Sequence, residues 1–127
     1  MKNINSTITF LQTDKLEETT AFYEEILSCP MVVDQGLCRI FQITQESYIG
    51  FCKHEFLEEN EDTVCVTFVF STKKEVDKWY EYLKKKEVKI KSPPKETKRF
   101  QIYNFFAMDP NGISIEFQTF LHPFPPE

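Results

Sequence analysis

The chain has 127 residues, which suits one domain or two small modules that share a core. Its net charge of −5 argues against nucleic acid as a partner. No apolar run approaches the roughly 20 residues that span a bilayer, and the start lacks the pattern of a signal peptide. We therefore expect a cytoplasmic protein that has no membrane partner.

The first half begins with a β-branched, alternating run at residues 4–12, which predicts a strand. Asp14 and Glu17 are spaced as in a capping box, so a helix is expected from there to about Leu27. Pro30 ends that helix. Short strands are then predicted at 31–34, 37–43 and 47–53.

The second half repeats this order. Residues 63–70 form a strong strand candidate, and Thr72 and Glu75 form a second capping box before a helix that ends near Lys86. A short strand at 88–91, a Pro- and Lys-rich connection at 91–99 and a strand at 101–108 are expected to follow.

The sequence therefore predicts two tandem β-α-β-β-β units. We expect modules at about 1–54 and 63–119, an acidic linker at 55–62 and a Pro-rich tail at 120–127. An offset of 58 residues lays Phe10 on Phe68.

The most informative segment is Phe105–Phe117, which contains Asp-Pro-Asn-Gly between two β-rich runs. Pro fixes φ, and Asn and Gly tolerate positive φ, so these four residues predict a turn between two strands. The alternation after the turn puts Ile115 and Phe117 on one face and Glu116 on the other. A carboxylate in a covered sheet is costly unless it is paired, solvated or metal-bound.

The four cysteines Cys29, Cys38, Cys52 and Cys65 are widely spaced and form no Cys-x-x-Cys. This spacing is a poor disulfide framework, and the cytosol keeps thiols reduced. We expect them to be small, buried free thiols.

The first strand running into Asp14, the segment Ala21–Leu27 and the segment Phe106–Gln118 resemble the vicinal oxygen chelate superfamily. That group contains glyoxalase I, the bleomycin- and fosfomycin-resistance proteins and the extradiol dioxygenases. The resemblance implies an α+β fold in which two tandem βαβββ modules form a curved mixed sheet with a central pocket. It also implies a homodimer.

Metal-using members of that superfamily take four ligands from the opening and closing strands of their modules. The matching residues here are Thr7, Gly50, Cys65 and Glu116, and only the last is a usual ligand. A register shifted by two residues would instead give Cys52, Cys65 and Glu116, with His54 nearby, as a set for an ion such as Zn²⁺.

Without a metal, Glu116 is the candidate catalytic base or hydrogen-bond acceptor. The other predicted ligand-binding residues flank the expected pocket: Thr7, Tyr48, Cys52, Cys65, Arg99, Tyr103 and Asn104.

We expect a protein that binds a small organic ligand without a cofactor or the usual divalent metal. The alternatives are a metal-dependent lyase, isomerase or dioxygenase with an atypical site, and a regulatory module without chemistry.

Overall fold

The computed structural model describes residues 3–53, 64–108, 110 and 112–125. The first half contains β1 (Ser6–Thr13), α1 (Leu16–Ala21), a π-helical turn η1 (Phe22–Ile26), β2 (Met31–Asp34), β3 (Cys38–Gln42) and β4 (Ser47–Lys53). The second half contains β5 (Val64–Val69), α2 (Lys73–Lys85), β6 (Lys95–Thr97), β7 (Ile102–Met108) and β8 (Ser114–Phe120). Within these residues, no helix is long and apolar enough to cross a membrane.

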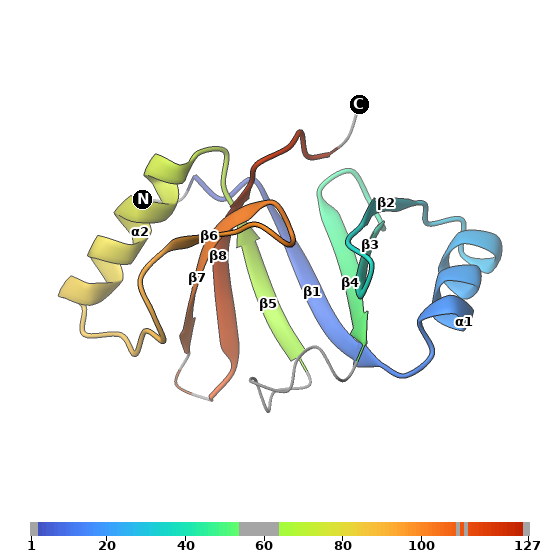
Figure 1. Cartoon of the computed structure of the whole chain (residues 1–127), viewed down its shortest axis with the longest axis horizontal. Coiled ribbons are helices and arrows are strands. Elements are labelled where there is room, and N and C mark those ends of the chain that lie inside the picture. The colour runs from blue at the N-terminus through green and yellow to red at the C-terminus, as the bar shows by residue number, and fades with distance from the viewer. Residues whose placement is uncertain (1–2, 54–63, 109, 111, 126–127) are drawn as a thin grey trace.

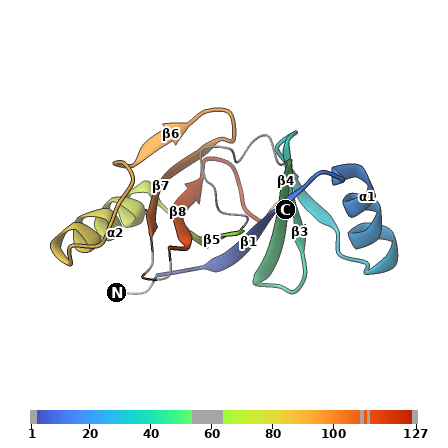
Figure 2. The same ribbon diagram turned by 90° about the horizontal axis from the view of Figure 1, so that it is seen from below.

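The eight strands form one mixed sheet in the order β2-β3-β4-β1-β5-β8-β7-β6. The sheet curves into a trough with β1 and β5 along its floor, and α1 and α2 lie outside the two walls (Figures 1 and 2). This is the predicted α+β fold with a curved mixed sheet. The predicted linker at 55–62 lies outside the described residues.

Three local expectations are wrong. Helix α1 begins after Lys15 without a side-chain cap, so Asp14 does not form the expected capping box. The predicted strand at 88–91 is a single bridge from Ile90 to Ala107. The connection that follows contains the short strand β6, which pairs with β7. The Thr72–Glu75 capping box of α2 is present, as predicted.

The two modules meet where β1 pairs antiparallel with β5, with Ile8 opposite Thr67. Each of these strands also pairs in parallel with the last strand of its own module, β4 or β8. The expected offset of 58 residues between the modules is wrong, because it equates residues that lie on opposite faces of the sheet. Phe10 lies in the inner core cluster, whereas Phe68 packs against the cluster beneath α2.

The outer face of the second module is closed by aromatic packing against α2. The Phe117 ring stacks on Phe105 at 4.9 Å, and Trp79 of α2 lies 5.5 Å from the same ring. In the first module, Tyr23 of η1 lies 5.5 Å from Phe41 and 5.2 Å from Phe51. Because the helices cover only the outer face, the inner face of the sheet is left to form a pocket.

The inner core depends on a close approach between two directly opposed residues, Phe10 of β1 and Gly50 of β4. The Phe10 ring occupies the space that a Cβ at position 50 would need. Gly50 is therefore required here for its missing side chain.

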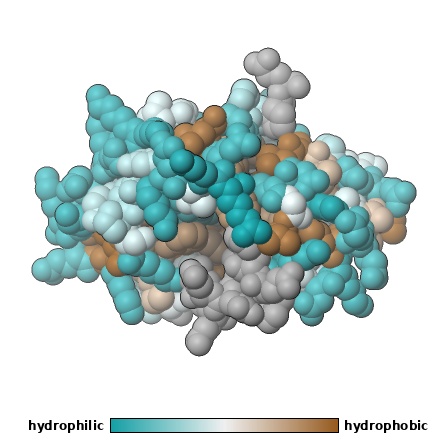
Figure 3. All heavy atoms as spheres, viewed as in Figure 1, coloured by the Kyte–Doolittle hydropathy of each residue, from teal (hydrophilic) through white to brown (hydrophobic). Residues whose placement is uncertain are grey.

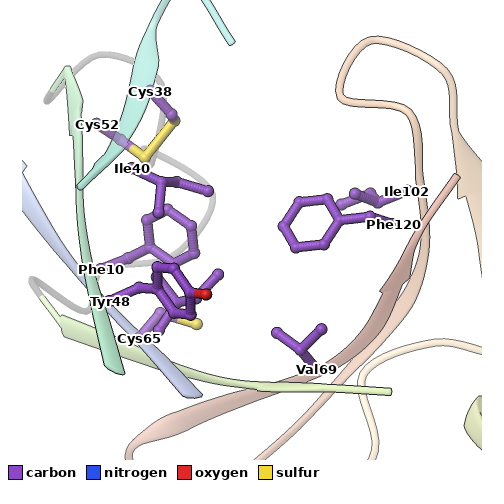
Figure 4. Packing of buried hydrophobic residues seen from close by; sticks show 10 residues of the cluster. Phe10, Cys38, Ile40, Tyr48, Cys52, Cys65, Val69, Ile102 and Phe120 are labelled. Atoms are coloured by element: carbon purple, nitrogen blue, oxygen red, sulfur yellow. A yellow bond between two sulfur atoms is a disulfide. The ribbon is translucent and has the colours of Figure 1, made fainter. Parts of the chain in front are cut away.

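A disulfide joins Cys38 of β3 to Cys52 of β4, which are directly opposed in the sheet (Figure 4). The expectation of four free thiols is therefore wrong in this structure, in which Cys29 and Cys65 lie outside the disulfide. The sequence gives no sign of this pair, because the register of β3 on β4 is what brings the two sulfurs together.

Replacing Gly50 by Ala should lower the free energy of unfolding by about 1–3 kcal/mol, the usual effect of overpacking a core. The added methyl group would overlap the Phe10 ring. Urea denaturation of Gly50→Ala and of Phe10→Leu/Gly50→Ala checks this, because the smaller Leu should restore part of the loss. A double variant that is no more stable than Gly50→Ala would contradict the proposed overlap.

Iodoacetamide should label two cysteines in the unfolded, unreduced protein and four after reduction, as counted by mass spectrometry. The disulfide closes a loop with a sequence separation of 14. Opening it should lower stability by about 3 kcal/mol through the entropy of the unfolded chain. A Cys29→Ser variant should lose one label in both states. Four labels before reduction would show that the disulfide is absent.

Candidate functional site

The site is built around Glu116, which lies mid-strand on β8 and is only 6% exposed. Thr67 Oγ1 on β5 donates a hydrogen bond to Glu116 Oε1 at 2.7 Å. Asn104 Nδ2 on β7 donates to Oε2 at 2.8 Å, and Thr97 Oγ1 on β6 donates to the Asn104 oxygen at 2.8 Å. Strands on both sides of β8 thus fix the carboxyl group.

Gln118 completes the surroundings of the carboxyl group from the next inward position on β8. With its amide nitrogen turned toward Glu116, it donates to Oε2 at 2.9 Å and to Oε1 at 3.2 Å. This orientation suits an ionised carboxylate. The opposite orientation would accept the hydrogen of a protonated carboxyl group, so the same residue accommodates both protonation states.

Burial raises the pKa of Glu116 above its ordinary value, because a charged carboxylate loses its hydration inside the sheet. The hydrogen bonds from Thr67 and Asn104 lower the pKa and oppose this effect. Burial is the larger influence, so the proton is held more tightly than in a free glutamic acid.

Glu116, Asn104 and Gln118 line one side of a cavity of about 260 Å³ in the trough. Its other walls are mainly apolar and include Phe10 and Ile102, which face each other across the trough (Figure 4). On the face that looks into the trough, hydrophobic side chains come to the surface between hydrophilic ones (Figure 3). The cavity therefore has one polar wall, and its remaining walls are mainly apolar.

Three of the predicted ligand-binding residues line this cavity: Asn104, Cys65 and Cys52. Cys52 does so as half of the disulfide, so it offers no thiolate to a metal. Tyr48 is buried in the inner core next to the tail and is not among the lining residues.

Three further predicted residues are placed elsewhere. Thr7 is exposed, one position away from the inward Ile8. Tyr103 packs outward beneath α2, where its hydroxyl donates to Asp77 at 2.6 Å, a bond that raises the Tyr103 pKa to about 12. Arg99 is exposed in the turn before β7 and is not among the lining residues.

The pairing register shows which side chains lie level with Glu116 in the sheet. Tyr48, Ile8, Thr67 and Glu116 form one row across the four central strands. This row contains one carboxylate, one phenol, one hydroxyl and one alkyl group, which is not the donor set of a divalent metal site. Among the residues the structure describes, no group of three or more His, Cys, Asp and Glu could hold an ion. His54 lies outside those residues.

Sequence reasoning missed three polar residues of the site: Thr67, Thr97 and Gln118. Gln118 could have been found, because it is two residues after Glu116 and strand residues alternate between faces. The two threonines come from other strands, so no local pattern points to them.

Replacing Glu116 by Gln should flatten the pH dependence of stability just above pH 4.5, the ordinary value for this group. With a raised pKa, the folded state binds more protons than the unfolded state, so stability falls as pH rises to the folded pKa. Gln resembles the protonated form and should remove this fall, leaving the variant at least as stable as the wild type at pH 7. Urea denaturation from pH 4 to 8 measures it.

Glu96→Gln is the matched control, because exposed Glu96 pairs with Lys73 and has a lowered pKa. The Glu96–Lys73 pair stabilises the folded protein above the ordinary pKa of Glu96, and this effect is lost as pH falls. Glu96→Gln should therefore keep the decrease in stability with rising pH that depends on Glu116. A Glu116→Gln variant that retains the wild-type slope would show that the raised pKa is absent.

Comparison with solved structures agrees with this architecture. A protein from Legionella pneumophila described as an NAD-dependent benzaldehyde dehydrogenase has a TM-score of 0.75 at 18% identity, over 90% of this chain and 98% of its own. Methylmalonyl-CoA epimerase from Mycobacterium tuberculosis has a TM-score of 0.70 at 11% identity, over 97% of this chain and 92% of its own. At these identities the similarity shows the fold alone.

A superfamily member from Vibrio splendidus gives a TM-score of 0.64 at 10% identity, over 89% of this chain and 97% of its own. No curated protein matches the chain by sequence. The family model for the Glyoxalase/Bleomycin resistance protein/Dioxygenase superfamily matches residues 4–117. The chain therefore belongs to this superfamily, as its sequence predicted.

Proposed function

We propose that this protein binds a compact organic cation in the cavity beside Glu116, without the divalent metal that its superfamily often uses. The observation that carries the proposal is a carboxyl group, 6% exposed, on the wall of an otherwise mainly apolar cavity. The side chains that donate hydrogen bonds to that carboxyl group within the described residues are uncharged: Thr67, Asn104 and Gln118.

A buried carboxylate without a cation is costly, and its pKa rises as a result. A ligand that brings a positive nitrogen to the carboxylate would remove that cost. Lys95 also borders the cavity, but it is exposed and water screens it. The polar wall therefore favours an ammonium or amidinium end group.

The size and walls of the cavity favour a compact, largely apolar ligand body. Its volume of about 260 Å³ lies just below the roughly 300–1,000 Å³ of pockets for drug-sized ligands. Phe10, Phe100 and Ile102 supply apolar contacts around it.

The metal-dependent alternative is less well supported, because no three His, Cys, Asp or Glu residues in the described part of the chain are grouped so that they could hold an ion. A metal-free proton transfer by Glu116 has one observation in its favour. Its raised pKa moves toward the range in which a carboxylate is an effective general base. Such an enzyme would still need to bind its substrate in this cavity.

The homodimer and the cytoplasmic location remain proposals. The disulfide between Cys38 and Cys52 bears on the second, because disulfides are rare in the cytosol. In a reducing compartment the two sulfurs would be thiols on the cavity wall.

n-Hexylamine should bind with one-to-one stoichiometry, as measured by isothermal titration calorimetry. Its ammonium group stays protonated up to pH 9, so its affinity should rise with pH through the Glu116 pKa and then level off. Glu116→Gln should weaken binding by at least about tenfold, the scale of losing a buried charge partner, and should remove the pH dependence.

Glu96→Gln is the control, since it removes an exposed carboxylate whose partner is Lys73 on the α2 side. Its affinity for n-hexylamine should equal that of the wild type. No binding by the wild type, or equal binding by Glu116→Gln, would refute a cation site at Glu116.

A further inference from the structure

The C-terminal tail closes one end of the trough with an aromatic side chain. After β8, the chain crosses from the second module toward β4 of the first (Figure 1). The Phe124 ring stacks on Phe120 of β8 at 4.3 Å and lies 4.8 Å from the Tyr48 ring of β4. One residue of the tail thus joins the two walls.

This closure lies next to the cavity of Glu116. Ile102 lines that cavity and is directly opposed to Phe120 in the β7–β8 pair. Gln118 and Phe120 are successive inward positions on β8. The Phe120 ring is therefore directly adjacent to the polar wall of the cavity. The end that Phe124 fills is therefore an extension of the same trough.

A hollow of about 550 Å³ lies at that end, lined by the tail together with residues of both modules. Beneath Phe124 lie the buried rings of Tyr48 and Phe120. Without the tail ring, these two aromatic faces would extend the apolar body of the cavity.

The tail is fixed before Phe124 by a backbone hydrogen bond from Leu121 to Gln101 at 2.8 Å. Phe124 itself is half-buried, and its ring packs against the aromatic rings of Tyr48 and Phe120. Its packing can therefore change without breaking the sheet.

We propose that Phe124 is a specificity-determining residue that sets the longest ligand the trough accepts. The inference rests on the proposed function, since it assumes that a ligand lies in the cavity with its polar end at Glu116. A short ligand fits with Phe124 in place. A longer apolar chain meets the Phe124 ring and gains no further burial.

The test measures the affinity of n-alkylamines, from butylamine to decylamine, for the wild type, Phe124→Ala and Phe124→Trp. Each buried methylene should tighten binding about fourfold until the chain reaches the tail ring. Phe124→Ala should move this limit outward by at least two methylenes and therefore tighten the longest amines at least about 16-fold. Phe124→Trp should move it inward.

Leu121→Ala is the control, because Leu121 is an exposed tail residue and should leave the limit unchanged. Circular dichroism establishes that each variant is folded. The same limit in all variants, with short amines binding normally, would overturn this inference and leave the cation site intact. Failure of every amine to bind the wild type would overturn the proposed function and this inference with it.

Discussion

The antiparallel pairing of β1 with β5 is the constraint on which the rest of the structure depends. It places Ile8 opposite Thr67 and joins two similar modules into one sheet without an edge between them. Because strand side chains alternate, this one register decides which residues of the central strands face the trough. The parallel pairing of β5 with β8 then sets Thr67 opposite Glu116, where its hydroxyl donates to the carboxyl group. Strand β5 belongs to both pairings and therefore links the site to the joint between the modules.

Within that frame, the chemistry of the site is that of one buried carboxyl group held by neutral donors. Tyr48, Ile8 and Thr67 share the row of Glu116 across the central strands, and none of them carries a charge. Hydrogen bonds from hydroxyl and amide groups offset part of the desolvation cost and add no charge. The pKa of Glu116 therefore stays raised, which means that binding of a proton or a cation stabilises this group.

The sequence predicted the strands and their order well, because alternation and turn residues are local properties. It also identified Glu116, whose inward direction follows from the apolar residues on either side. The placement of Thr7 in the pocket and the offset of 58 residues between the modules are wrong. Similarity between the repeats does not determine the pairing register, and therefore not which face of the sheet a residue occupies. Asn104 and Tyr103 were both assigned to the pocket, yet neighbours on a strand face opposite ways, and only Asn104 lines it. The disulfide and Thr67 depend on cross-strand neighbours, which no single segment encodes.

The shared sheet accounts for the trough, but individual side chains on its strands and the C-terminal tail decide how much of the trough stays open. The Cys38–Cys52 pair forms part of one wall, and Phe124 fills the opposite end with a ring. Neither contact is needed for the strands to pair, so both can vary while the fold is kept. A superfamily whose members bind very different molecules requires such freedom, since the fold alone does not determine a ligand. In this chain the tail, more than the sheet, limits the length of the cavity.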